Sequence, residues 1–288
     1  MWLERGTLER SLRERGEHAL RCGALLTIPT ECEVVEQGGV GFLVRVVASL
    51  EWKARARSAQ QQSGSNPFLP YDPDLFVTDI SDTHLCLLNK YNAVERHLLI
   101  VTRDFEEQES PLSRRDFEAL WACLAELDGL AFYNAGPAAG ASQRHKHLQL
   151  VPGSIGAGPE RAPIESLIGT ARFRGRLGEL PDLPFAHAIA RLDGWVELAP
   201  SEAAERSLDL YRELLRSLGC DRPPRPYNLL ATRDWMLLVP RTREACESIE
   251  VNALGFAGSL LARNREQLEL VRRKGPMTIL RSVAEGRG

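Results

Sequence analysis

The sequence predicts an α+β fold, in which short strands form a sheet and helices pack with it. Two apolar runs at 84–89 and 97–102 are separated by a connection of ordinary length, as in neighbouring strands of one sheet. A helix with a capping signal at Ser113 follows, and two more strand-like runs come at 131–134 and 147–152. This order of sheet and helix is typical of α+β proteins.

The N-terminal elements are a helix and a strand. Leucines recur among alternating Arg and Glu in the first 20 residues, which predicts a charged surface helix with a narrow apolar stripe. Residues 40–50 are rich in β-branched residues and predict a strand. Residues 54–67 are polar and of low complexity, so we expect a flexible loop there. The leucines of the stripe are Leu3, Leu8, Leu12 and Leu20.

The helix after Ser113 has the clearest signals in the chain. Ser113 is followed three residues later by Asp116, a capping-box-like start, and apolar residues then repeat at helical spacing until Gly129. The repeating residues are Phe117, Leu120, Trp121, Leu124 and Leu127. Beyond the strand at 131–134, the Gly, Ala and Ser residues of 135–144 predict a loop that leads into the strand at 147–152.

The second half of the chain repeats the helix and strand pattern. An apolar stripe at 201–218 predicts a helix, and apolar runs near 227–231 and 235–239 predict strands. Residues 153–184, dense in Gly, Pro and Arg, indicate a long excursion between two halves or an insertion over a site. We therefore expect three parts: an N-terminal catalytic half at 1–160, a linker at 161–184 and a C-terminal half at 185–288.

Composition and charge exclude several classes of protein. The chain has 288 residues, of which 43% are hydrophobic and 26% charged, as in an ordinary folded protein. A net charge of −3 gives no global positive field for a nucleic-acid backbone or an anionic membrane, so we expect neither partner. The apolar runs are too short to span a bilayer, and the charged N-terminus lacks a secretory signal. We therefore expect a cytoplasmic protein.

The six cysteines occur singly, without a C-x-x-C pair, and several lie inside apolar runs. A buried free thiol behaves as a small apolar side chain, so we interpret them as structural thiols, with a zinc site as the alternative. Lysine is rare: only Lys53, Lys90, Lys146 and Lys274 are lysine among the 36 basic residues. Each of these is either a solvated surface residue or a functional one.

The segment at 145–149 has the pattern of a reactive site. Side chains alternate between the two faces of a strand, so His145, His147 and Gln149 face one way and Lys146 faces the other. The preceding loop contains glycines such as Gly140, whose missing Cβ lets backbone N–H groups approach an anion closely. These residues favour phosphate chemistry.

Two other interpretations of the H-x-H spacing stay open, a metal site and a purely structural pair. A metal site would need a third ligand. The remaining histidines are scattered without a helpful pattern of carboxylates, which weighs against a metal. They are His18, His84, His97 and His187.

The HKHLQ segment after a G-P-x-x-G loop resembles the histidine-triad superfamily, in the branch where glutamine replaces the third histidine. Within that branch of nucleotidyltransferases, the chain resembles the diadenosine tetraphosphate (Ap4A) phosphorylases, also called ATP adenylyltransferases. The resemblance implies an antiparallel sheet with packed helices, like that of galactose-1-phosphate uridylyltransferase, and two halves that form one composite domain. It rests on NPFLPYDPDLFV (66–77), LLNKYNAVERHLLIVTRDFEEQESPLS (87–113), FYNAGPAAGASQRHKHLQLVP (132–152), PYNLLATRDWMLLVPRT and NALGFAGSLL.

The resemblance also implies catalytic roles. His147 would be the nucleophile that attacks the α-phosphorus and becomes adenylylated, which suits an imidazole that is neutral near pH 7. His145 would fix the geometry of the site or form a hydrogen bond with the backbone of the site. Gln149 would donate its amide N–H to an α-phosphate oxygen without being able to ionise.

The implied substrate contacts surround these residues. Asn89 matches an asparagine that binds the ribose hydroxyls, and Lys53 matches a lysine that reaches the polyphosphate. The phosphate-contacting loop is matched by Asn134, Gly140, Ala141, Ser142 and Gln143. Ser142 and Gln143 are neutral donors, so positive charge has to come from elsewhere. Apolar residues of 66–77 such as Phe68, Leu69 and Phe76 are candidates for an adenine pocket, with Asn66 at its edge, although an apolar residue more often belongs to the core.

The implied reaction is the reversible phosphorolysis of Ap4A to ATP and ADP through an adenylyl-His147 intermediate. The expected partners are these nucleotides and phosphate. No bound cofactor is expected to be required, and a magnesium ion that accompanies the nucleotide is compatible with the absence of a carboxylate cage. The alternatives are a related transferase that uses adenylyl sulfate or a nucleotide sugar, a hydrolase, and a nucleotide sensor without catalysis.

Overall fold

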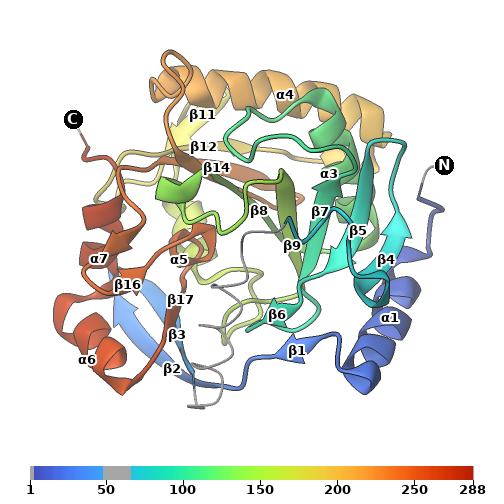
Figure 1. Ribbon diagram of the computed structural model, residues 1–288. Helices are drawn as coiled ribbons and strands as arrows, with labels where there is room; N and C mark the ends of the chain where they lie inside the picture. Colours follow the sequence, from blue (N-terminus) through green and yellow to red (C-terminus); the bar gives the residue numbers. More distant parts are fainter. Residues whose placement is uncertain (1–2, 48–65, 288) are drawn as a thin grey trace.

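The computed structural model describes residues 3–47 and 66–287. Its main feature is a ten-stranded sheet in which every neighbouring pair is antiparallel (Figure 1). The predicted α+β fold class is confirmed. The strands in spatial order are β10 (Arg172–Arg174), β11 (Leu177–Glu179), β12 (Ala188–Arg191), β14 (Trp235–Pro240), β13 (Tyr227–Ala231), β8 (Gly129–Ala135), β9 (His147–Pro152), β7 (Leu98–Thr102), β5 (His84–Leu88) and β4 (Phe76–Asp79).

The two halves of the chain meet in the middle of this sheet. Strand β8 pairs with β13 along its length, and Asn134 stands opposite Asn228 in that register. The strands predicted at 84–89, 97–102, 131–134, 147–152, 227–231 and 235–239 are all confirmed. The division into parts at 1–160, 161–184 and 185–288 stays a prediction, since the sheet itself runs through both halves.

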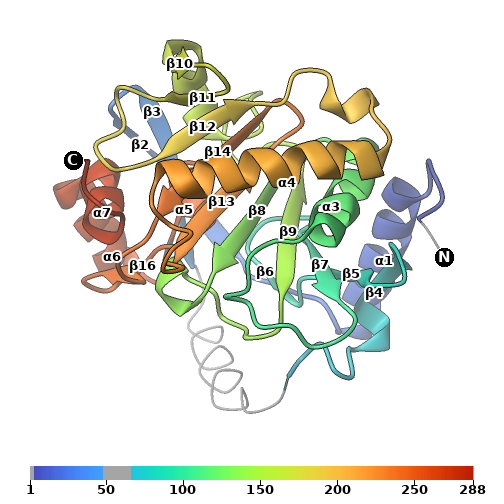
Figure 2. The ribbon, with the colours of Figure 1, turned by 90° about the horizontal axis from the view of Figure 1, so that it is seen from above.

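One face of the sheet is covered by helices. Helix α3 (Arg114–Glu126) lies beside α4 (Pro200–Ser217) across this face (Figure 2), and Trp121 Nε1 of α3 donates to Ser207 Oγ of α4 at 2.7 Å. The capping box predicted for α3 is present, because Ser113 and Asp116 bond to each other's backbone N–H groups. Both predicted helices are therefore confirmed, and their apolar stripes form one core with alternate residues of the strands.

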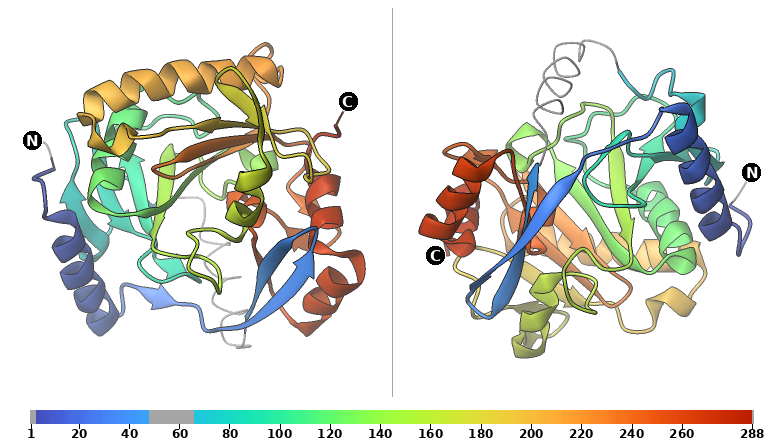
Figure 3. Two further views of the ribbon diagram at one scale, coloured as in Figure 1. Left: turned by 180° about the vertical axis from the view of Figure 1, so that it is seen from behind. Right: turned by 90° about the horizontal axis from the view of Figure 1, so that it is seen from below.

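The other face carries the site and is partly covered by a hairpin of the first half and by the C-terminal elements. Strand β3 (Val40–Val47) lies between β2 (Thr30–Gln37) and the C-terminal strand β17 (Ser259–Ala262), which runs parallel to it. Figure 3 shows this hairpin, in blue, beside the red helices α6 (Arg265–Lys274) and α7 (Pro276–Val283). The short helix α5 (Ala253–Phe256) packs between β17 and β8. A second apolar core fills this face.

The N-terminal helix begins later than predicted. Helix α1 runs over Leu8–Cys22 and ends at Gly23, whose φ of 79° is left-handed. Leu8, Leu12 and Ala19 are its buried residues, whereas Leu20, expected on the apolar stripe, is 54% exposed. The helix therefore contacts the core through a narrower stripe than the leucine pattern predicts.

Several short elements have no counterpart in the predictions. The excursion at 153–184 contains the 3-10 helix η3 (Pro163–Thr170) and the strands β10 and β11, so it extends the large sheet. Strand β2 was missed because its charged residues obscure the alternation. The remaining elements are β1 (Leu26–Thr27), η1 (Pro73–Leu75), β6 (Tyr91–Asn92), η2 (Pro137–Ala139), η4 (Trp195–Glu197), β15 (Ala245–Cys246) and β16 (Ile249–Glu250).

Two further predictions concern thiols and membranes. The cysteines are all free; Cys86, Cys123, Cys220 and Cys246 are buried, as expected of structural thiols, whereas Cys22 and Cys32 are exposed. Among the described residues, no helix is both long enough and apolar enough to cross a bilayer. The segment 54–65, expected to be a flexible loop, lies outside the described residues.

Candidate active site

The loop between β8 and β9 places the motif next to the second half of the chain. Gly136 and Gly140 flank η2 with φ values of 90° and 85°, in the region that favours glycine. A Cβ atom at Gly140 would lie 2.7 Å from the Val251 carbonyl oxygen and 2.9 Å from the Asn252 Cα. The loop therefore needs glycine here for a close approach between two backbones.

His147 is held as a neutral imidazole with a defined tautomer. Its Nδ1 lies 2.8 Å from the backbone carbonyl oxygen of His145. Because a carbonyl oxygen can only accept, Nδ1 carries the proton and Nε2 keeps its lone pair. Burial lowers the pKa of His147 to about 4, and the carbonyl bond only partly opposes this effect. At neutral pH the ring is therefore uncharged.

His145 uses both of its ring nitrogens within the protein. Its Nε2 donates to the Thr102 carbonyl oxygen at 2.8 Å, and its Nδ1 accepts from the Asn66 amide at 2.9 Å. Burial lowers the pKa of His145, so this ring is also neutral near pH 7. With both ring nitrogens of His145 bonded and His147 bonded at Nδ1, the two rings do not offer a pair of free nitrogens for joint metal binding.

Sequence reasoning missed Gln108, which holds the backbone of His147. The ladder between β8 and β9 ends at the pair Phe132 and Gln149, so the strands separate before they reach His147. Gln108 fills this gap: its amide donates to the carbonyl oxygens of Asn134 (3.0 Å) and His147 (3.1 Å), and its Oε1 accepts from His147 N at 2.8 Å. Its only sequence signal is that it lies within the matched segment 87–113.

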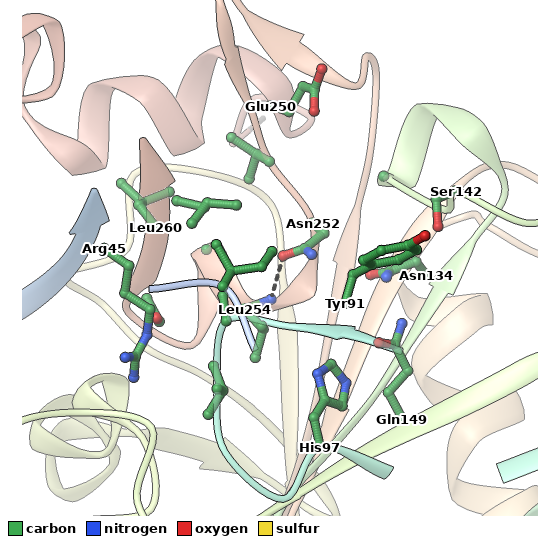
Figure 4. A pocket seen from close by; sticks show the side chains of 18 of the residues that line it. Arg45, Tyr91, His97, Asn134, Ser142, Gln149, Glu250, Asn252, Leu254 and Leu260 are labelled. Atoms are coloured by element: carbon green, nitrogen blue, oxygen red, sulfur yellow. Dashed lines mark hydrogen bonds between the residues drawn. The ribbon is translucent and has the colours of Figure 1, made fainter. Parts of the chain in front are cut away.

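A cavity of about 310 Å³ opens beside the motif strand (Figure 4). Of the predicted site residues, those that line it are Asn89, Asn134, Gly140, Ser142 and Gln149. His145, His147, Ala141 and Gln143 do not belong to the lining as far as the described residues define it. Lys53 lies outside the described residues.

Two lining asparagines are oriented by hydrogen bonds. Asn134 Oδ1 accepts from Asn228 Nδ2 at 2.8 Å and from Ala253 N at 2.9 Å, which ties β8 to the second half, and the Asn134 amide nitrogen has no hydrogen-bond partner among the described residues. Asn89 Nδ2 donates to His97 Nδ1 at 3.1 Å, which leaves Asn89 Oδ1 as an acceptor. His97 lines the cavity next to Gln149 (Figure 4), and burial lowers the pKa of His97 to about 4.

The second half supplies much of the lining. Val251 and Asn252 come from the segment that leads into α5, Leu254 lies in α5, and Leu260 comes from β17. The matched text NALGFAGSLL contains three of these residues, so a sequence signal existed, although it assigned them no role. Arg45 of β3 also lines the cavity and was missed; its Nη2 donates to the Ile155 carbonyl oxygen at 3.0 Å.

Lys146 is not a solvated surface lysine. It lies on the opposite face of β9 from the histidines, as predicted, but it is 1% exposed and its Nζ contacts Asp116 (2.9 Å) and Glu106 (3.0 Å). Burial acts to raise the pKa of Asp116, but its bonds to His84 and Lys146 outweigh burial and hold that pKa below its usual range. Lys146 therefore anchors α3 and the segment before it behind the motif strand.

Two of the four remaining histidines form hydrogen bonds with carboxylates, although the sequence indicated no helpful pattern of carboxylates around them. His84 bonds to Asp116 at 3.1 Å, and His18 bonds to Asp74 at 2.8 Å. Cys22 joins His18 and Asp74 to give three side chains whose ligand atoms lie within 4.8 Å of one another. This cluster is on α1 and η1 rather than in the cavity lining.

The candidates for an adenine pocket do not line the cavity either. Phe68 packs against the rings of His145 and His147 at centroid distances of 5.5 and 5.3 Å. Leu69 is 45% exposed, and Phe76 stacks on Tyr71. Phe68 therefore forms part of the apolar wall that keeps the two histidines neutral.

Comparisons with known proteins agree with this arrangement. A family model described as the Ap4A phosphorylase N-terminal domain matches residues 1–170, and one described as the ATP adenylyltransferase C-terminal domain matches residues 181–285. Diadenosine 5',5'''-P1,P4-tetraphosphate phosphorylase 2 of Saccharomyces cerevisiae is 27% identical over 79% of this chain and 78% of that protein. Protein APA1 of the same yeast is 26% identical over 65% of this chain and 64% of that protein.

Solved structures show the same fold. The crystal structure of yeast Ap4A phosphorylase Apa2 superposes with a TM-score of 0.81 and 24% identity, covering 100% of both chains. The structure of Apa2 in complex with Ap4A gives the same TM-score at 23% identity, again over 100% of both chains. The resemblance drawn from the motifs is confirmed. The first family model alone spans more than half of this chain. The chain therefore belongs to the Ap4A phosphorylase family, with an ATP adenylyltransferase C-terminal domain in its second half.

Proposed function

We propose that this protein is a nucleotidyltransferase that cleaves Ap4A with inorganic phosphate to give ATP and ADP. The observation that carries the proposal is the state of His147: a neutral ring, with the proton on Nδ1 and the Nε2 lone pair free for attack. A neutral imidazole is both a nucleophile and a leaving group, as a two-step transfer requires. The yeast relative named for Ap4A phosphorolysis supports the choice of substrate.

The transfer has two balanced steps. In the first, His147 Nε2 attacks the α-phosphorus of Ap4A, the bond from that phosphorus to its bridging oxygen breaks, and ATP leaves. In the second, an oxygen of inorganic phosphate attacks the same phosphorus, the P–N bond breaks, and ADP leaves. The imidazole lone pair returns to Nε2, so the enzyme is regenerated and the reaction is reversible.

Other residues of the site hold the phosphates and the ribose. We assign Gln149, Ser142 and the backbone around Gly140 to the transferring phosphoryl group, because they line the cavity next to the motif strand. Asn89 Oδ1 suits a ribose hydroxyl, since His97 already occupies its amide. We assign positioning to His145, polyphosphate contact to Lys53, and contacts to the phosphate loop to Asn134, Ala141 and Gln143, on the basis of the matched motifs.

The test is a product assay with purified protein. Ap4A is incubated with and without inorganic phosphate, and ATP, ADP and AMP are resolved by chromatography. ATP and ADP in equal amounts, formed only with phosphate, are the expected result. AMP and ATP formed without phosphate would make the protein a hydrolase. Turnover of adenylyl sulfate or a nucleotide sugar in place of Ap4A would point to a related transferase, and binding without turnover to a sensor.

The proposed substrates also bear on partners and location. Ap4A, ATP, ADP and phosphate are all small anions of the cytoplasm, which we propose as the location. The net charge of −3 supports small-molecule partners rather than a nucleic acid or an anionic membrane surface.

A further inference from the structure

The charges that line the cavity are balanced in the described part of the chain. Arg45 and Arg263 line it together with Glu244 and Glu250, and Arg263 forms an ion pair with Glu250. A chain of phosphates with several negative charges needs positive potential at its site. The described lining alone does not supply it.

A buried arginine lies directly behind this lining. Arg241 follows β14 and is 4% exposed. Within residues 3–47 and 66–287, no carboxylate forms an ion pair with its guanidinium group, and every hydrogen bond it makes goes to a neutral acceptor. The acceptors are the carbonyl oxygens of Ala139, Arg243, Glu244, Val251 and Val283 and the side-chain oxygen of Asn228.

Such a group is costly to bury and remains charged. Burial lowers the pKa of Arg241 to about 10, so the guanidinium is still protonated at neutral pH. Carbonyl dipoles and the ring of Phe256, whose centroid is 5.2 Å from the guanidinium carbon, solvate the charge without cancelling it. The Glu244 carboxylate attracts this charge without forming an ion pair with it, and it only partly opposes the effect of burial. Buried charges are normally paired, so this one is a source of positive potential that lacks a bonded counter-charge.

Arg241 contacts the backbone of the cavity lining, or of a residue next to it, in two places. Its Nη1 donates to the Ala139 carbonyl oxygen at 3.2 Å, and its Nη2 donates to the Val251 carbonyl oxygen at 2.9 Å. Gly140, the residue after Ala139, and Val251 both line the cavity. The guanidinium thus joins the glycine loop of the first half to the segment before α5 in the second half.

We propose that Arg241 is a positioning residue whose buried charge is compensated by the phosphate groups of a nucleotide in the cavity. It acts through its field and by holding the Ala139 and Val251 carbonyl groups in place, without touching the ligand. Water is excluded from its surroundings, so its field is screened less than that of an exposed arginine. The inference rests on the proposed nucleotide function and adds the source of positive charge for the phosphate chain.

The test compares ligands that differ only in phosphate number. Affinities for adenosine, AMP, ADP and ATP are measured by calorimetry for the wild type and for Arg241→Gln. The matched control is Arg272→Gln, which removes an exposed arginine that pairs with Glu33. For Arg241→Gln we expect adenosine to bind as in the wild type and ATP to bind roughly tenfold more weakly, with AMP and ADP between them. The control should match the wild type for every ligand.

Equal losses for adenosine and ATP in Arg241→Gln, or no loss at all, would overturn the inference. Thermal unfolding establishes whether the variant folds. If it does not, Arg241→Lys carries the test, because it keeps the charge and loses most of the hydrogen bonds. ATP binding within about threefold of the wild type would then support a role of the charge, whereas an equal tenfold loss for adenosine and ATP would refute it.

Binding and turnover separate this inference from the proposed function. A wild type that binds ATP through Arg241 but does not cleave Ap4A would refute the proposed function and leave the inference standing. An active phosphorylase whose ATP affinity is unchanged in a folded Arg241→Gln variant would refute the inference alone. Tripolyphosphate, which has no nucleoside, should raise the melting temperature of the wild type and of Arg272→Gln but not of Arg241→Gln.

Discussion

Replacement of Gln108 by Leu should impair stability and catalysis together, because this side chain closes the gap where β8 and β9 separate. Gln108 is 2% exposed, and its side chain makes three hydrogen bonds, to the Asn134 carbonyl oxygen and to the N–H and carbonyl groups of His147. Leu has a similar volume but offers no donor or acceptor. The substitution therefore leaves the N–H and carbonyl groups of His147 without a partner inside the protein, whereas the Asn134 carbonyl oxygen keeps its bond from Gly136 N at 3.0 Å.

The expected cost follows from those two groups. Each buried polar group left without a partner costs about 1–3 kcal/mol, and local relaxation recovers part of the sum, so we expect a loss of about 2–4 kcal/mol in the free energy of unfolding. His147 also loses the bonds that fix its backbone. A displacement of its ring by about 1 Å would lower kcat by roughly 100-fold.

The assay is urea unfolding together with steady-state Ap4A cleavage. Ser207→Ala is the matched control, because it removes one buried hydrogen bond, from Trp121 to Ser207, on the helix-covered face of the sheet. The control should lose about 1 kcal/mol of stability and keep the wild-type kcat. A Gln108→Leu variant that loses less than about 1 kcal/mol, or that keeps the wild-type kcat, would refute this account of how His147 is positioned.

Two other predictions concern buried histidines and the glycine loop. The pKa values of His97 and His147 are lowered by burial to about 4 in the folded state, so both stay neutral while the unfolded chain takes up protons below its usual pKa of about 6.5. Their stability contribution is complete above pH 6.5 and is lost as the pH falls toward 4. Between pH 7.5 and 5.5 these two histidines should contribute a drop of about 2–3 kcal/mol in the free energy of unfolding, so the drop should be about 1–1.5 kcal/mol smaller in His97→Gln than in the wild type; an equal drop in both proteins would contradict the assignment. For Gly140→Ala we expect a loss of at least about 2 kcal/mol and weaker nucleotide binding, because the new Cβ would meet the Val251 carbonyl oxygen at 2.7 Å. Gly153→Ala has a similar φ of +76° but no atom within 4 Å of its Cβ, so it should cost only about 1 kcal/mol, and similar losses for the two variants in urea unfolding would show that strain alone matters.

Local patterns predict the central elements because local forces determine them. Helix α3 has its capping box at Ser113 and Asp116, and the neighbouring strands have short apolar runs with clear boundaries. Alternation along β9 predicts that Lys146 faces away from the histidines. It cannot show that Lys146 is buried, because Asp116 and Glu106 approach it only in the folded chain.

The features that sequence reasoning missed depend on contacts between distant segments. Gln108 acts on His147, 39 residues away, and nothing in its neighbourhood distinguishes it from other polar residues of its segment. Arg241 differs from the many surface arginines only by its burial among carbonyl groups contributed by Ala139 and Val283. The charged residues of strand β2 obscure its alternation, and its pairing with β3 is evident only once the two strands are folded together.

The most direct test of the central claim is to isolate the covalent intermediate. The protein is mixed with excess Ap4A in the absence of phosphate, and ATP release and covalent modification are followed by rapid quench and peptide mass spectrometry. We expect one equivalent of ATP per active site, an adenylyl group on His147 alone, and release of ADP when phosphate is added; His147→Ala should give neither burst nor modification. Continued AMP release without phosphate, or an adenylyl group on another residue, would contradict the account.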